Sequence, residues 1–186
     1  MTNAFNVVLF FIFTMATLTQ KDIVAQNSFF IKTGVVSFES NAPQENIHAE
    51  SNKLSGLLNT DQNTFAFSLN IRSFKGFNNP LQQEHFYENY MEYALFPQST
   101  FSGKLIDKFD RDLKSQKLRA KGQLEIHGVK KERIIEVIIT KSGITYEIES
   151  DFNVLLADHN ISIPKIVFQK IAENIKVKVK GELANN

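Results

Sequence analysis

The residues of this chain most able to do chemistry are its four histidines, since it contains no cysteine. They are far apart in the sequence: His48, His85, His127 and His159. A folded sheet could gather three of them around a metal ion, but we expect no metal. His127 precedes Gly128, so we expect it to make a hydrogen bond at a turn. The chain has no Gly-x-Ser-x-Gly, glycine-rich phosphate loop or His-Glu-x-x-His motif, so we expect no catalytic residue and no cofactor.

His85 stands at the head of an aromatic segment, Gln83–Lys104, which also contains Glu92. In one interpretation, His85 or Glu92 is a polar anchor at the mouth of a pore and contacts a ligand head group. In the other, the pair holds the segment against the wall of the fold. A third hypothesis is a hydrolase-like enzyme that acts on a small amphiphile through His85 or His127. Because nothing supplies a nucleophile or an oxyanion site, we expect no enzyme.

The aromatic segment interrupts a sequence that otherwise predicts strand after strand. It holds six aromatic residues: Phe86, Tyr87, Tyr90, Tyr93, Phe96 and Phe101. Its first half can form a turn or two of helix, which Pro97 should end because proline has no N–H and its ring blocks the preceding turn. Ser99–Leu105 returns to strand. Such a segment could plug the end of a barrel or gate a cavity inside one.

Alternation of apolar and polar residues predicts the strands. It is clean over Thr64–Ile71, Gln116–Ile126 and Ile144–Asn153, and weaker over Ile47–Leu58, which predicts one poor strand or a broken pair. In the last clean segment, Ile144, Tyr146, Ile148 and Phe152 should face inward. Glu132–Lys141 has adjacent apolar pairs, Ile134 with Ile135 and Ile138 with Ile139, which predicts that its outer side is covered as well.

About eight strands joined by short turns predict a single all-β domain. An open antiparallel sheet would expose two edges for mispairing, whereas closure into a barrel removes them. Eight strands leave an interior just wide enough for side chains or for one small ligand. Ala120 and Gly122 are small residues on an inward face. If their space is empty, a carrier is favoured; if it is filled, the chain is a structural barrel with a packed core.

The amino-terminal end predicts export. Val7–Thr19 is an apolar run of 13 residues, too short for a spanning helix of ~20 residues but suited to a signal peptide. We expect residues 1–25 to be removed after Ala25, leaving a periplasmic or secreted domain at 26–186 without a transmembrane helix. No Lys or Arg precedes the run, so a buried or anchoring helix is the alternative. The net charge of +1 predicts no nucleic-acid partner.

Two sets of motifs resemble the YceI-like family. The first is Glu84-His85-Phe86, Asn89–Glu92, Phe96-Pro97 and Thr100–Lys104, and the second is Gly122–Lys131. The resemblance runs from Phe29 to Leu183. It implies an exported, lipocalin-like antiparallel β-barrel that binds a polyisoprenoid chain in an elongated apolar pore. The departures are Lys130, where threonine is usual, and a charged loop at Asp107–Ser115; neither is expected to touch the pore.

With the resemblance, an apolar interior favours ligand binding over an ordinary packed core. Burial contributes ~0.8 kcal/mol per CH₂, so a long apolar ligand needs few polar contacts. The expected occupant is a polyprenyl chain or an isoprenoid quinone, held by a carrier or scavenger; a homodimer is compatible with the sequence. The residues expected to line the pore are Phe67, Phe86, Tyr90, Phe101, Leu124, Ile126, Tyr146 and Ile148.

One basic stripe has two interpretations. Lys176, Lys178 and Lys180 alternate along the last strand and could attract anionic lipid head groups. The preceding strand carries Glu147, Glu149 and Asp151 on its outer face. We expect cross-strand pairing to neutralise the lysines.

Overall fold

The computed structural model describes residues 28–185. The signal peptide predicted at residues 1–25 lies outside this range. Nine antiparallel strands form one sheet, and within residues 28–185 no helix has the length and hydropathy that crossing a membrane requires. The strands are β1 (Ser28–Asn41), β2 (Asn46–Ser51), β3 (Ser55–Asn59), β4 (Thr64–Asn70), β5 (Gln98–Leu105), β6 (Ser115–Ile126), β7 (Val129–Ser142), β8 (Thr145–Leu155) and β9 (Asn174–Asn185).

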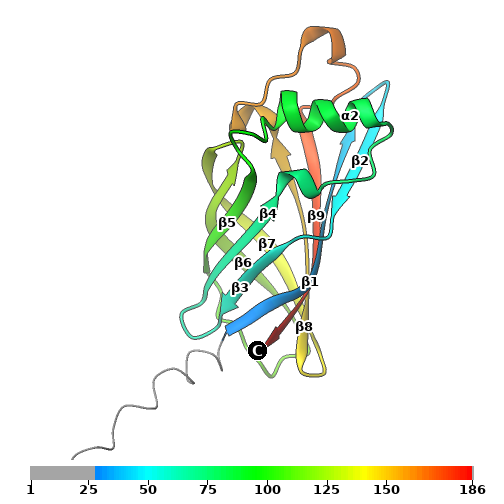
Figure 1. Cartoon of the computed structure of the whole chain (residues 1–186). Helices are drawn as coiled ribbons and strands as arrows, with labels where there is room; N and C mark the ends of the chain where they lie inside the picture. The colour runs from blue at the N-terminus through cyan, green and yellow to red at the C-terminus, as the bar shows by residue number, and fades with distance from the viewer. Residues whose placement is uncertain (1–27, 186) are drawn as a thin grey trace, which may run out of the picture.

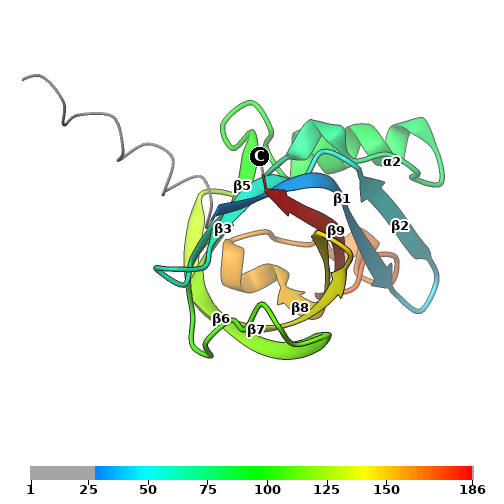
Figure 2. The same ribbon diagram turned by 90° about the horizontal axis from the view of Figure 1, so that it is seen from below.

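The sheet closes because β1 also pairs with β9, from Phe29 opposite Asn185 to Glu39 opposite Lys176. Eight strands, all except β2, make the closed ring seen along its axis in Figure 2. The predicted eight-stranded antiparallel barrel is therefore confirmed. The other edge of β1 is shared: its first residues pair with β3 and residues 36–41 pair with β2. The weak segment Ile47–Leu58 is thus a broken pair of strands, of which β3 is a member of the ring and β2 lies beside it.

The connection between β4 and β5 holds η1 (Ile71–Ser73), α2 (Pro80–His85) and a π-helical turn, η2 (Phe86–Tyr90). Asn79 begins α2 by accepting a hydrogen bond from the Gln82 backbone N–H at 2.9 Å, and Pro80 follows at the first helical position, where no N–H is needed. The helix lies at the upper end of the barrel, on one side of the ring and beside β2 (Figures 1 and 2). The turn or two of helix predicted for the first half of the aromatic segment is present, and it ends before Pro97. The helical segment ends at Tyr90, and Glu92 then turns the backbone at φ 41°.

Burial follows the predicted alternation on β6, where Leu118, Ala120 and Leu124 are buried. Two predictions about apolar residues are wrong. Ile144 is 92% exposed because it lies in the β7–β8 turn, before β8 begins at Thr145. The outer side of β7 is not covered, since Ile134 and Ile138 are 57% and 44% exposed.

The ladder between β7 and β8 is short. It runs from Ser142 opposite Thr145 to Ile138 opposite Glu149 and stops there. By contrast, β6–β7 and β8–β9 are paired along nearly their whole length. Across the upper part, which we call the β7–β8 seam (residues 129–137 and 150–155), two side chains link the strands. Ser150 Oγ donates to the Glu136 carbonyl at 2.6 Å, and Arg133 Nη2 donates to the Asn153 carbonyl at 2.8 Å.

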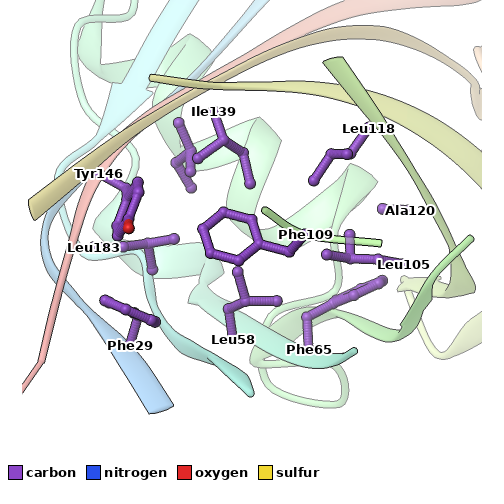
Figure 3. Close-up of a cluster of buried hydrophobic side chains, with 11 residues drawn as sticks. Phe29, Leu58, Phe65, Leu105, Phe109, Leu118, Ala120, Ile139, Tyr146 and Leu183 are labelled. Carbon is purple, nitrogen blue, oxygen red and sulfur yellow. The ribbon is translucent and has the colours of Figure 1, made fainter. Parts of the chain in front are cut away.

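A cluster of buried side chains fills the lower end of the barrel, and Figure 3 shows Phe109 in its middle. Phe109 comes from the β5–β6 loop and packs against Tyr146 and Phe29, with ring centroids 5.2 and 6.3 Å away. Arg119 holds the loop through Asp107 at 2.7 Å. Phe109 closes the lower end of the barrel, and none of the residues Asp107–Ser115 lines the interior cavity, as expected.

Candidate functional site

A cavity of about 570 Å³ runs through the barrel above this lower cluster. Every strand contributes to its wall, and so do α2, η2 and the loop before β9. The wall is mostly apolar, and its aromatic part includes four phenylalanines, among which Phe38 and Phe86 each contact the other three rings: Phe38, Phe74, Phe77 and Phe86. A volume of this size lies within the ~300–1,000 Å³ typical of small-molecule sites.

Seven of the eight residues expected to contact a ligand lie on the cavity wall: Phe67, Phe86, Tyr90, Phe101, Leu124, Ile126 and Ile148. Tyr146 does not. It belongs to the lower cluster, where its ring meets Phe29 edge-on at 5.1 Å. Its hydroxyl donates to the Arg111 carbonyl at 3.3 Å, and burial raises its pKa. The period-2 pattern correctly predicted that Tyr146 faces inward, but it could not predict where along the barrel axis Tyr146 lies.

Sequence reasoning missed several wall residues. Val36 and Phe38 line the cavity from β1, and alternation within that strand could have identified them. Phe74 and Phe77 lie in the loop before α2, where no periodicity applies. Val167 and Ile171 lie in the loop before β9, and their role depends on how that loop folds over the barrel.

The two small inward residues have different roles. Ala120 is buried and lines the cavity, so its small side chain does leave room, as expected. The same expectation is wrong for Gly122. A Cβ there would lie 2.3 Å from the Ser102 carbonyl oxygen on β5. Gly122 stands opposite Gly103, and the absent side chains let β5 and β6 approach closely where the barrel bends.

Polar groups gather at the upper end of the cavity, which we call the mouth. Glu45, Gln82, His85 and Lys170 are among its lining residues. Gln82 Nε2 donates to Glu45 at 2.9 Å, which links α2 to the β1–β2 turn. His85 is exposed at this edge of α2. It therefore lies where a polar anchor was expected.

Glu92 lies away from the cavity wall and pairs with His127 instead of His85. Its carboxylate is 2.6 Å from His127 Nε2, while His127 Nδ1 is 3.1 Å from the His159 carbonyl. His127 thus joins three segments rather than capping its own turn. Phe96 packs edge-on against the imidazole at 4.6 Å, and its ring leaves no space for a Cβ on Gly128. This contact explains the His-Gly pair of the second motif.

His159 is fully buried and ties the loop after β8 to β7. Its Nδ1 donates to the Val129 carbonyl at 3.1 Å, while Nε2 has no hydrogen-bond partner among residues 28–185. Burial lowers the pKa of this imidazole. The described residues contain no group of three or more His, Cys, Asp or Glu side chains that could hold a metal ion.

The basic stripe on β9 is paired only in part. Lys178 stands opposite Asp151 and Lys180 opposite Glu149. Lys180 Nζ lies 2.8 Å from the Glu149 carboxylate, and this hydrogen bond lowers the pKa of Glu149. Lys176 stands opposite Asn153, so the neutralisation is incomplete at that position.

The model of the YceI-like domain matches residues 25–183 of this chain. No curated protein matches it. Among solved structures, BcnA of Burkholderia cenocepacia superposes with a TM-score of 0.68 at 16% identity, covering 81% of this chain and 96% of that one. A polyisoprenoid binding domain from Saccharophagus degradans gives 0.72 at 12% identity, covering 85% and 98%. A Campylobacter jejuni YCEI protein gives 0.59 at 17% identity, covering 74% and 84%. At these sequence identities, the superpositions show a shared fold and no more.

Proposed function

The chain belongs to the YceI-like family, and on that premise we propose that it is an exported protein that holds an isoprenoid-type lipid inside its barrel. The occupant is a polyprenyl chain or an isoprenoid quinone, and the protein acts as its carrier or scavenger. The structurally similar polyisoprenoid binding domain of Saccharophagus degradans supports this ligand class.

The observation that carries the proposal is the cavity itself. It is about 570 Å³, it is lined mainly by apolar side chains, and it has polar groups only around part of its wall. The buried cluster around Phe109 closes its lower end. An apolar chain would therefore enter from the mouth and stop above this cluster, with its polar end left near His85 and Gln82.

Hydrophobic burial alone supplies enough affinity. One isoprenoid unit has five carbons, and at ~0.8 kcal/mol per CH₂ it contributes roughly 4 kcal/mol. Association and chain ordering cost several kcal/mol. Three buried units, roughly 12 kcal/mol before these costs, therefore suffice for roughly micromolar binding, which corresponds to about −8 kcal/mol.

The residues favour binding over catalysis. Both ring nitrogens of His127 face protein acceptors, Glu92 and the His159 carbonyl. The imidazole is thereby committed to holding three segments together. His85 is exposed at the mouth, where it suits the orientation of a ligand head group.

Native mass spectrometry of the protein purified from a bacterial host, followed by solvent extraction, tests the proposal. We expect one prenyl lipid per chain, or uptake of an added isoprenoid quinone. A protein that carries no lipid and takes up no added quinone or polyprenol would overturn it. In that case the barrel is a structural one and the family membership reports fold alone.

A matched pair of variants tests whether the ligand occupies the cavity. Ala120→Phe puts a large side chain into the cavity, so we expect quinone binding to weaken about tenfold or more, since even two displaced methylenes are worth roughly 1.6 kcal/mol. Ala66→Phe makes the same change at an exposed position on β4 and should leave binding unchanged. Titration by quenching of tyrosine fluorescence measures both. Equal affinities for the two variants would place the ligand elsewhere.

A further inference from the structure

The segment before β9, residues 162–172, stands above the open end of the barrel (orange in Figure 1), and we call it the rim loop. Its residues divide between two directions. Val167 and Ile171 line the cavity. Ile166 and Phe168 are 90% and 62% exposed. Large apolar side chains exposed next to a cavity mouth are unusual for a surface that meets only water.

The rim loop is held in a defined shape. Val167 N–H donates to the Pro164 carbonyl at 3.0 Å, and Lys170 N–H donates to the Val167 carbonyl at 2.8 Å. The Gln169 carbonyl accepts from the Gln44 N–H at 2.9 Å. These bonds tie the loop to the β1–β2 turn. The exposed side chains are therefore presented by a folded turn rather than by a loose end.

The charge of the rim loop has one sign. Lys165 and Lys170 are its only ionisable residues, and both are exposed. Across the mouth, Leu81 of α2 is 59% exposed and also lines the cavity. Apolar tips flanked by lysines match the interface of a bilayer, where acyl chains lie beneath anionic head groups.

We propose that the rim loop docks on an anionic lipid bilayer, with Ile166 and Phe168 entering the boundary between head groups and acyl chains. Because Val167 and Ile171 of the same loop line the cavity, docking would bring the cavity mouth to the bilayer, and an apolar ligand would pass between the two without crossing water. The inference rests on the proposed function for its purpose, while membrane docking is measured independently of any ligand.

Flotation of the full chain with vesicles tests the docking. Vesicles of phosphatidylcholine with phosphatidylglycerol should bind the protein, and those of phosphatidylcholine alone should bind it less. The double variant Ile166→Ser, Phe168→Ser should lower binding about tenfold or more, because tenfold corresponds to ~1.4 kcal/mol, less than one fully buried side chain contributes. Ile144→Ser is the matched control, since Ile144 is 92% exposed in the β7–β8 turn at the opposite end of the barrel.

Three outcomes would overturn the docking proposal. They are a wild-type chain that does not float, a double variant that floats as well as the wild type, and an equal loss in Ile144→Ser. Sedimentation of the wild type as a dimer that the double variant abolishes would assign the rim to a second copy of the chain instead.

Ligand transfer separates this proposal from the function on which it rests. Quinone delivered from detergent should load the wild type and the double variant equally. Quinone delivered from vesicles should load the double variant about tenfold more slowly, in line with its weaker partition. Loading of neither protein from either source would overturn the proposed function and leave the flotation result standing. Equal loading of both from vesicles would overturn the role of the rim loop.

Discussion

At the residue scale, two residues with left-handed backbone conformations are joined by a hydrogen bond between their side chains. Glu92 and His127 have φ values of 41° and 51°, a conformation that costs about 1–2 kcal/mol for a residue with a side chain. Their side chains meet at 2.6 Å. The contact holds the end of the aromatic segment against the β6–β7 turn, so the bond offsets strain at both of its ends.

This arrangement predicts an unusual order of stability at position 92. Glu92→Ala and Glu92→Gly both lose the bond to His127, but glycine also removes the strain of the positive φ. We expect the glycine variant to be more stable than the alanine variant by about 1 kcal/mol, measured by urea unfolding.

Glu84 provides the control for this comparison because it lies within α2. There the order should reverse, with alanine more stable than glycine by about 1 kcal/mol. If alanine is more stable than glycine at position 92 as well as at position 84, the left-handed turn at Glu92 stores no strain.

At the element scale, the β5–β6 loop acts as the floor of the barrel. Phe109→Ala removes a ring that is 6% exposed and leaves a void among Phe29, Tyr146 and Leu118. Truncation of a buried phenylalanine costs about 3–5 kcal/mol, and thermal and urea unfolding should show a loss in this range.

Phe168→Ala is the matched control for the floor, since Phe168 is 62% exposed and its loss should change stability by less than about 0.5 kcal/mol. A similar small effect for Phe109→Ala would mean that the loop is not part of the core in solution.

The β7–β8 seam is the second element with a measurable consequence. Amides of residues 129–137 and 150–155 that do not pair with β6 or β9 lack a ladder partner. We expect them to exchange hydrogen at least about tenfold faster than the paired amides of 138–142 and 145–149. Hydrogen exchange resolved by NMR measures this. Uniform protection along both strands would contradict an open ladder.

Strands β4, β6 and β8 could be predicted from the sequence because each is amphipathic on its own. In β4 and β6 one face is buried and the other is exposed, and this alone produces the alternation of apolar and polar residues. It fails where tertiary context decides. Ile134 and Ile138 look like residues covered on both sides, yet they lie on the outer face. The turn at Glu92 also involves a side-chain contact with His127, which no local pattern encodes.

At the scale of the whole molecule, closure could be predicted from the cost of exposed edges, and the apolar wall from the inward face of each strand. The position of each residue along the barrel axis could not. Tyr146 and Ile148 share a face and both belong to the lower cluster, but only Ile148 also lines the cavity. That difference depends on the register of eight strands and on where the β5–β6 loop folds.

The pairing of β1 with β9 has a consequence for how the chain folds. The ladder joins residues such as Phe29 and Asn185, so its contacts span almost all of the described chain. Folding rates fall as contacts become less local, because the entropy of closing the loop must be lost before the contacts form. Closure of the ring should be the slow, late event. Until it occurs, β1 and β9 present free edges, and a chain that lacks β9 should aggregate rather than fold into a smaller barrel.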